Sequence, residues 1–159
     1  MLIGAPGAGK TRTGKRVARL LNVPLIDTDK RIVAEHGPIA NIFATQGAEH
    51  FRALERDAVA RALTEHAVVT LGGGAVLNPD TQADLAGKRV VQLTVSPESV
   101  ALRILGGKRP LLKDGVAAWS KLVAERQPIY DRLSQLTLDT SHQSLDGIAK
   151  QIVNWLQAS

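Results

Sequence analysis

The chain has 159 residues, of which 44% are hydrophobic and 22% are charged, close to the averages of soluble globular domains. This length is typical of one domain, residues 1–159, and no repeat or linker divides it. The composition excludes disorder and coiled-coil fibres, and no apolar run approaches the roughly 18 residues of a membrane-spanning helix. Because cysteine is absent, disulfides and thiol catalysis are excluded, and we expect a cytoplasmic protein that does not contact a membrane.

The net charge of +5 suits either a nucleic acid or a small anionic substrate. The basic residues are scattered, and the aromatic residues are too few for a base-stacking surface. They are Phe43, Phe51, Trp119, Tyr130 and Trp155. We therefore expect no nucleic-acid partner. A compact chain without an obvious excess of apolar surface is also expected to be a monomer.

Short apolar runs alternate along the chain with segments of helical period. Strands are expected at residues 1–3, 24–26, 67–71, 90–95 and 136–139. Helices are expected at residues 11–22, 47–65, 97–105, 117–133 and 145–156, with Pro128 breaking or kinking the fourth. The first strand is short for a strand, so we expect the natural chain to start earlier. This alternation predicts an α/β fold with a parallel sheet covered on both faces, whose ligands bind at the carboxyl ends of the strands.

The segment GAPGAGKT, residues 4–11, matches the phosphate-binding pattern G-x-x-x-x-G-K-[ST] in full. Its glycines let the backbone turn tightly, and the following helix adds its positive end. The backbone N–H groups that converge on phosphate oxygens are expected at Gly7, Ala8 and Gly9. Lys10 is expected to reach the β- and γ-phosphates and Thr11 to bind Mg²⁺. The loop predicts nucleotide binding, but it does not say which reaction follows.

Two carboxylates, Asp27 and Asp29, follow the second predicted strand, and strand alternation points them the same way. Beside a phosphate loop, one of them can hold Mg²⁺, often through water, and the other can take a proton from an attacking hydroxyl. The alternative is that either one only caps the helix that begins near Lys30.

Arg52 and Glu55 lie three residues apart on one predicted helix. They form either an ordinary surface pair or a pair in which Glu55 orients Arg52 toward a substrate carboxylate. The three glycines that follow the third predicted strand, Gly72, Gly73 and Gly74, permit a close approach of backbone to ligand.

Residues 106–116 contain Arg109, which follows Gly106 and Gly107 and directly precedes Pro110, and they lie between two predicted helices. Such a basic, glycine-flanked segment indicates a mobile lid that brings an arginine to the transferred phosphate. Arg126 lies just before Pro128 and Tyr130, and its simplest interpretation is a cation favoured by the dipole of a helix end.

Taken together, these motifs resemble the shikimate kinase family, P-loop kinases of aromatic amino-acid biosynthesis. They follow the order of the family at similar spacing and cover essentially the whole chain. The matching pieces are residues 4–11, Asp27-Thr28-Asp29, Phe51-Arg52-x-x-Glu55, Leu71-Gly72-Gly73-Gly74, Arg109-Pro110-Leu111-Leu112 and Arg126-x-Pro128-x-Tyr130.

The resemblance implies a three-layer α/β/α P-loop kinase fold of the nucleoside-monophosphate-kinase type. It implies a five-stranded parallel sheet in the order 2-3-1-4-5, a substrate-binding region at about residues 28–60 and a mobile lid. The implied reaction is the ATP-dependent phosphorylation of the 3-hydroxyl of shikimate to shikimate 3-phosphate, with Mg²⁺.

For shikimate, the resemblance makes Asp29 the hydroxyl ligand and the best candidate for catalytic base. Arg52 and Arg126 would hold the carboxylate of shikimate. The glycines Gly72, Gly73 and Gly74 would lie against the substrate, Gly73 through its backbone. The aromatic pair Phe43 and Phe51 would help to line the pocket.

For ATP, the resemblance adds Arg109, which would bridge the phosphates and the substrate, and Gln143, which falls in the adenine loop. Asp27 would support Mg²⁺ through water, together with Thr11. Arg12 stands where the family usually has a second Ser or Thr, so it either adds charge near the α-phosphate or points to solvent. The segment 103–109 is one residue shorter than is common in the family.

Two other functions stay open at this point. One is another small-molecule P-loop kinase, such as a gluconate kinase, which would share Lys10 and Thr11 but has less reason for two arginines at positions 52 and 126. The other is a nucleotide-binding regulatory domain, which would require neither Asp29 nor an arginine-bearing lid.

Overall fold

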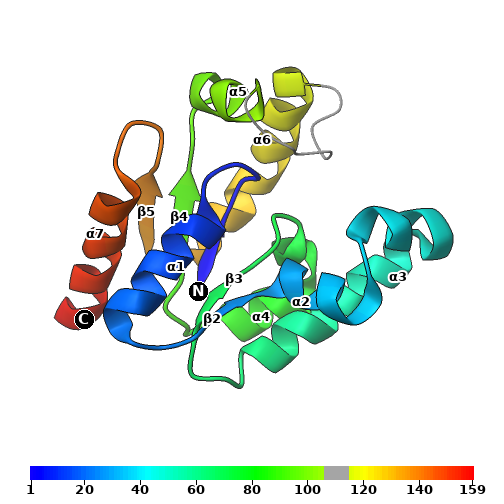
Figure 1. Ribbon diagram of the computed structural model, residues 1–159, viewed down its shortest axis with the longest axis horizontal. Coiled ribbons are helices and arrows are strands. Elements are labelled where there is room, and N and C mark those ends of the chain that lie inside the picture. Colours follow the sequence, from blue (N-terminus) through cyan, green and yellow to red (C-terminus); the bar gives the residue numbers. More distant parts are fainter. Residues whose placement is uncertain (106–114) are drawn as a thin grey trace.

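Five short strands form a parallel sheet in the order β2-β3-β1-β4-β5, in a computed structural model that describes residues 1–105 and 115–159, apart from the side chains of residues 104 and 105 (Figure 1). The strands are β1 (Leu2–Gly4), β2 (Leu25–Asp27), β3 (Val68–Thr70), β4 (Val91–Thr94) and β5 (Leu136–Asp139). Every pairing is parallel. The predicted α/β class and strand order are therefore confirmed.

Helices connect these strands along the described part of the chain. They are α1 (Lys10–Leu21), α2 (Thr28–His36), α3 (Ile39–Ala62), α4 (Pro79–Leu85), α5 (Pro97–Leu105), α6 (Gly115–Leu133) and α7 (Leu145–Ala158), with a short 3-10 helix, η1 (Ala75–Leu77), before α4. Because each strand–helix unit returns the chain in the same direction, the sheet is parallel throughout.

Side-chain alternation along the strands divides the core between two faces of the sheet. In β1, Leu2 joins an apolar cluster with residues of α1 and α7, whereas its neighbour Ile3 joins residues of α3, α4 and α6. In β3, Val68 and Val69 divide between the same two clusters. Helices thus cover both faces, as the predicted three-layer arrangement requires.

The region between β2 and β4 is more helical than the sequence pattern indicated. The predicted helix 47–65 is the second part of α3, which starts at Ile39 and changes direction at Gly47, whose φ of 86° is left-handed. The elements α2, η1 and α4 are short, and only the start of α2 was anticipated. Asn78 begins α4 by accepting hydrogen bonds from the backbone N–H groups of Asp80 and Thr81.

Of the break or kink predicted at Pro128, the break is wrong, because α6 continues through this residue to Leu133. A proline inside a helix leaves the carbonyl four residues earlier without its usual donor. Here that residue is Ala124, and both Ala124 and Pro128 are exposed to solvent. Water can therefore satisfy the carbonyl, and the helix tolerates the proline.

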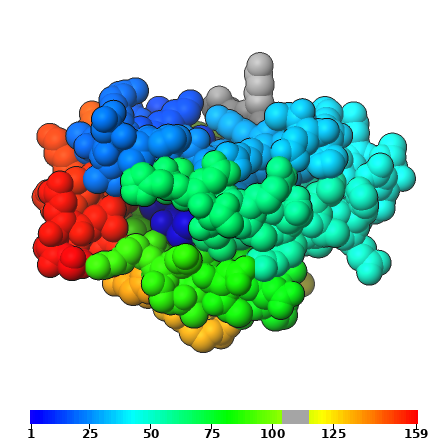
Figure 2. Space-filling view, turned by 90° about the horizontal axis from the view of Figure 1, so that it is seen from below, coloured from blue at the N-terminus to red at the C-terminus, as the bar shows by residue number. Residues whose placement is uncertain are grey.

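A cavity of about 430 Å³ lies at the amino ends of β1, β3 and β4, lined mainly by apolar side chains. Figure 2 shows this side of the molecule, with the dark blue N-terminal residues at the bottom of a hollow beside the red α7. The lining of this cavity contains few polar side chains, and the predicted site residues lie at the opposite, carboxyl ends of the strands. Among the described residues, no helix is long and apolar enough to cross a membrane.

Candidate active site

The loop between β1 and α1 is the phosphate loop that the sequence predicted. Gly7 and Gly9 both have left-handed φ angles, 86° and 85°, which permit the tight turn ahead of α1. The loop borders a cavity of about 160 Å³ at the carboxyl ends of the strands. The cavity is also lined by Asp27, Asp29 and the first two of the three glycines.

Lys10 lies across the phosphate loop, and its Nζ donates to the carbonyl oxygens of Gly4 at 2.8 Å and Ala5 at 3.0 Å. The N–H of Ala8 donates back to Ala5 at 3.2 Å and so closes a turn. Of the three N–H groups expected to converge, those of Gly7 and Gly9 belong to residues that line the cavity.

Asp27 contacts the predicted Mg²⁺ ligand Thr11 and also caps α2. Its Oδ2 accepts a 2.5 Å hydrogen bond from the Thr11 hydroxyl, which brings the two proposed Mg²⁺ ligands together. Its Oδ1 accepts from the backbone N–H of Lys30 at 3.1 Å and caps α2. Thr70 lines the same cavity, and its buried hydroxyl has no hydrogen-bond partner among the described residues.

Asp29 lies in the first turn of α2, so strand alternation is not what brings it next to Asp27, and that expectation is corrected. Both carboxylates nevertheless line the cavity. Burial raises the pKa of Asp29, and the negative charge of Asp27 raises it further. The cations of Lys10 and Arg52 act against this rise. Asp29 is thus a carboxylate whose basicity exceeds that of an exposed aspartate.

The three glycines after β3 each make room for a different side chain. A methyl group at Gly72 would lie 2.6 Å from Asp29 Oδ1, and one at Gly74 would lie 2.5 Å from an Arg52 nitrogen. A methyl group at Gly73 would lie 3.2 Å from an Arg126 nitrogen. The backbone of residues 72–74 therefore packs against Asp29, the predicted base, and against Arg52 and Arg126, the two arginines predicted to bind the substrate carboxylate.

Arg52 and Glu55 pair within α3, because the Arg52 guanidinium donates to Glu55 Oε1 at 2.7 Å. The Glu55 side chain is buried and that of Arg52 is half-exposed. Glu55 therefore holds the guanidinium on its buried side, and the rest of the guanidinium is accessible to a ligand. Burial raises the pKa of Glu55, and the hydrogen bond from Arg52 opposes that rise. The prediction that Glu55 orients Arg52 rather than forming a surface pair is supported by this asymmetry.

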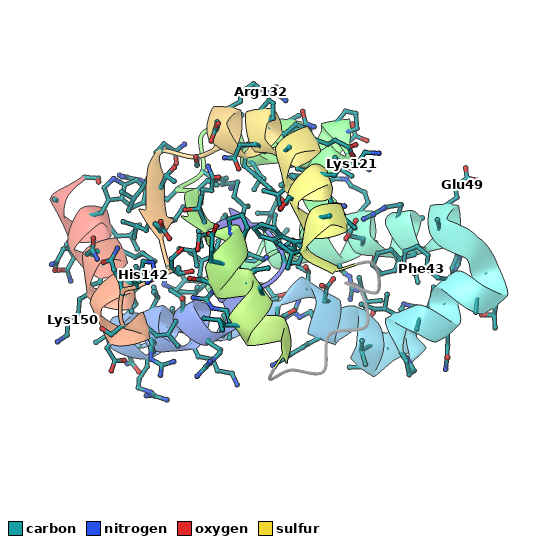
Figure 3. All side chains as sticks on the ribbon, turned by 90° about the horizontal axis from the view of Figure 1, so that it is seen from above. Phe43, Glu49, Lys121, Arg132, His142 and Lys150 are labelled. Carbon is teal, nitrogen blue, oxygen red and sulfur yellow. The ribbon has the colours of Figure 1, made fainter. Side chains whose placement is uncertain are left out.

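Aromatic side chains lie beside this arginine. The rings of Phe43 and Phe51 are 4.8 Å apart, and the Arg52 guanidinium lies 5.5 Å from the centre of the Phe51 ring. Figure 3 shows Phe43 on the part of α3 that extends from the sheet, at the opposite end of the molecule from His142.

Gln143, next to His142, is exposed and bonds to the Asp139 carbonyl and to Gln151.

Arg126 reaches the glycines from α6, seven residues before the helix ends, so it is not the helix-end cation of the alternative interpretation. One turn later, the Tyr130 hydroxyl donates to the Gly73 carbonyl at 2.6 Å. Burial raises the pKa of Tyr130, although the Arg126 charge beside it acts the other way. In the motif Arg126-x-Pro128-x-Tyr130, Arg126 therefore places a cation beside Gly73, and Tyr130 holds the Gly73 backbone through its hydrogen bond.

Arg12 is exposed and lines the mouth of the cavity, next to Lys10 and Thr11. Arg109 and most of the predicted lid lie outside the described residues. Sequence reasoning missed the Thr70 hydroxyl, and it missed Trp119 and Thr140, whose side chains bond to the phosphate loop. No local motif marks these three residues, since only the fold brings them to the site.

The comparisons with known proteins agree with this geometry. The family model described as shikimate kinase matches residues 6–157. A protein of Thermobifida fusca named shikimate kinase is 48% identical over 163 residues, which cover all of this chain and 95% of that protein. The solved structure of a shikimate kinase from Acinetobacter baumannii in complex with shikimate has a TM-score of 0.91 and 28% identity, covering 99% of this chain and 91% of the other.

A gluconokinase from Sinorhizobium meliloti is also similar, with a TM-score of 0.67 and 19% identity, covering 99% of this chain and 90% of the other. At that identity, the likeness shows a shared fold alone.

Proposed function

The chain belongs to the shikimate kinase family, and we propose that it transfers the γ-phosphoryl group of ATP to the 3-hydroxyl of shikimate in aromatic amino-acid biosynthesis. The observation that carries this proposal is the packing of Asp29, Arg126 and Arg52 on three successive glycines beside the phosphate loop. A base and two guanidinium groups on one backbone segment suit a substrate that has a hydroxyl at one end and a carboxylate at the other.

In this proposal the arginines hold the carboxylate of shikimate and fix the rotation of its ring. Glu55 keeps Arg52 in place through its 2.7 Å hydrogen bond. Asp29 then accepts the proton of the 3-hydroxyl as that oxygen attacks the γ-phosphorus. Its raised pKa makes it a better proton acceptor than an exposed aspartate.

On the nucleotide side, the N–H groups of the loop and Lys10 bind the β- and γ-phosphates. Gln143 is proposed as a nucleotide contact and Arg109 as the arginine that reaches the transferred phosphate, although Arg109 lies outside the described residues. Arg12, at the mouth of the cavity, adds positive charge near the phosphates.

The donor atoms at the cavity suit Mg²⁺, which prefers oxygen ligands. Thr11 and Asp27 lie 2.5 Å apart through their oxygens, and the Thr70 hydroxyl nearby has no partner among the described residues. In that part of the chain no three His, Cys, Asp or Glu side chains gather, so water and phosphate oxygens would complete the coordination. When bound, Mg²⁺ neutralises charge on the β- and γ-phosphates.

A coupled assay of ADP release tests the proposal directly. We expect ADP release with shikimate, and none above the background with gluconate or without an acceptor. Release with gluconate alone would support the sugar-acid kinase, and nucleotide binding without release would support a regulatory domain. The monomeric state and the cytoplasmic location stay predictions, which sedimentation analysis and cell fractionation would check.

A further inference from the structure

Three successive carbonyl groups of the phosphate loop each accept a hydrogen bond from a side chain of a different element. Trp119 Nε1, on α6, donates to the Pro6 carbonyl at 2.8 Å. Arg103, on α5, donates to the Gly7 carbonyl at 2.6 Å. The Thr140 hydroxyl, just after β5, lies 2.9 Å from the Ala8 carbonyl oxygen and 3.0 Å from the Thr94 carbonyl oxygen, and it shares its single proton between these two acceptors. We call these three side chains the carbonyl anchors.

The carbonyl anchors are themselves held in place. Trp119 and Thr140 are only 3% and 2% exposed. Arg103 also donates to the Thr140 carbonyl at 2.7 Å, and the Thr140 backbone N–H donates to Thr94 at the end of β4 at 2.8 Å. Two of the anchors are therefore connected to each other and to the sheet.

Holding a carbonyl also sets the direction of the N–H group that follows it. No cis peptide bond occurs among the described residues, so the C=O and N–H of each peptide unit point in opposite directions. Trp119 therefore orients the N–H of Gly7, and Thr140 orients the N–H of Gly9. Both glycines line the cavity beside Lys10.

Contacts from outside the loop restrict the backbone most strongly at glycine, because glycine has the greatest conformational freedom. A loop with glycines at left-handed φ angles has many accessible conformations when it is not held. Hydrogen-bond donors that already point at their ligand avoid the cost of reorganisation on binding. The contacts lie on the side of the peptide units away from the N–H groups, so they do not compete with phosphate.

We propose that Trp119 and Thr140 are positioning residues that preorganise the N–H groups of Gly7 and Gly9 for the nucleotide, and that Arg103 supports them by holding the Gly7 and Thr140 carbonyls. The inference rests on the proposed function only in taking ATP as the nucleotide. It predicts a selective effect, in which losing an anchor weakens ATP binding and leaves shikimate binding unchanged, because the anchors hold carbonyls of the phosphate loop, whereas Asp29, Arg52 and Arg126 pack on residues 72–74.

Thr140 offers a matched pair of variants. Thr140→Val removes the hydroxyl at nearly constant shape, and Thr140→Ser keeps it. We expect calorimetric titration to show an ATP dissociation constant about five- to tenfold higher for Thr140→Val, the scale of one lost hydrogen bond, and restoration by Thr140→Ser. The shikimate dissociation constant should stay that of the wild type in both variants.

Trp119→Phe is an independent variant, because it keeps an aromatic ring in the core and removes only the N–H donor. Trp155→Phe, near the end of α7, is its control, since the ring of Trp155 stacks with Arg89. We expect a weaker ATP affinity for Trp119→Phe and an unchanged one for Trp155→Phe. If Thr140→Val fails to fold, the tryptophan pair still decides the question.

The proposal is overturned if Thr140→Val and Trp119→Phe fold and bind ATP as tightly as the wild type. It is equally overturned if ATP and shikimate affinities fall by the same factor, which would indicate general loosening of the fold. Because binding is measured for each ligand alone, a wild-type protein that binds ATP but does not phosphorylate shikimate would contradict the proposed function and leave this test intact.

Discussion

Asp29 is the residue in which stability and function conflict. Burial and the neighbouring Asp27 raise its pKa, which means that the folded protein holds the ionised carboxylate at an energetic cost. Lys10 and Arg52 reduce that cost without removing it. A group that is unfavourable for folding and lies beside a phosphate loop is typical of a catalytic site.

Asp29→Asn should lower kcat by at least about a hundredfold, the low end for general base catalysis. The amide keeps the size of the side chain but cannot accept the proton of the hydroxyl. Steady-state kinetics with shikimate and ATP provides the measurement. A higher Michaelis constant with an unchanged kcat would restrict Asp29 to substrate binding.

The same variant should be more stable than the wild type at neutral pH. Between the ordinary pKa of 3.8 and the raised value, the folded state binds more protons than the unfolded state, so stability falls as the pH rises through this window. The substitution removes that loss. Thermal melts at pH 7 should show a higher Tm for Asp29→Asn, and the advantage should shrink at a pH below both pKa values. A lower Tm at pH 7 would contradict the inferred cost.

Arg52→Lys keeps the positive charge but loses the planar pair of donors that matches a carboxylate. Each charged hydrogen bond contributes roughly 1.5–3 kcal/mol, so the shikimate affinity should fall about ten- to a hundredfold. ATP affinity should change little. Calorimetric titration with each ligand checks both expectations, and an unchanged shikimate affinity would remove Arg52 from the substrate site.

Arg126→Lys should behave like Arg52→Lys, and the double variant provides the sharper result. Both guanidinium groups are expected to bind one carboxylate, so their effects should not add. The binding free energy lost in the double variant should differ measurably from the sum of the two single losses. Strict additivity would place the two arginines on separate ligands.

At the scale of elements, each glycine of the turn after β3 lies against a different predicted site residue. Gly72→Ala should mainly lower kcat by displacing the Asp29 carboxylate, whereas Gly74→Ala should mainly weaken shikimate binding by displacing Arg52. None of the three glycines has a left-handed φ angle, so alanine fits the backbone and strain does not confuse the result. Kinetics and shikimate titration of both variants would show whether the effects separate as expected; equal losses in both quantities would contradict it.

The sequence predicts the elements well where one local signal is enough. The phosphate loop, the apolar strands and the spacing of Arg52 and Glu55 are local patterns, and the structure confirms them. The kink at Gly47 and the helix α4 depend on short polar segments with weak periodicity. Pro128 shows the limit of a local rule, because solvent exposure of Ala124 decides that the helix continues.

At the scale of the whole molecule, the strand order is what assembles the site. Because β3 lies between β1 and β2, the loop after β1, the carboxylates after β2 and the glycines after β3 meet at one edge of the sheet. The sequence predicts this meeting once the order is known. It does not reveal Trp119 or Thr140, which approach the loop from residues more than a hundred positions away.

A single sheet that carries both ligand sites should melt as one unit, and each ligand should raise its Tm. A ligand at a hundred times its Kd stabilises the folded state by about 2.7 kcal/mol. For a domain of this size that corresponds to roughly 5–10 °C. Calorimetric melts with ATP, shikimate and gluconate test this, with gluconate as the control expected to give no shift. Two separate transitions, only one of them moved by shikimate, would show that residues 1–159 do not form one cooperative domain, because a ligand stabilises only the unit whose folding creates its site.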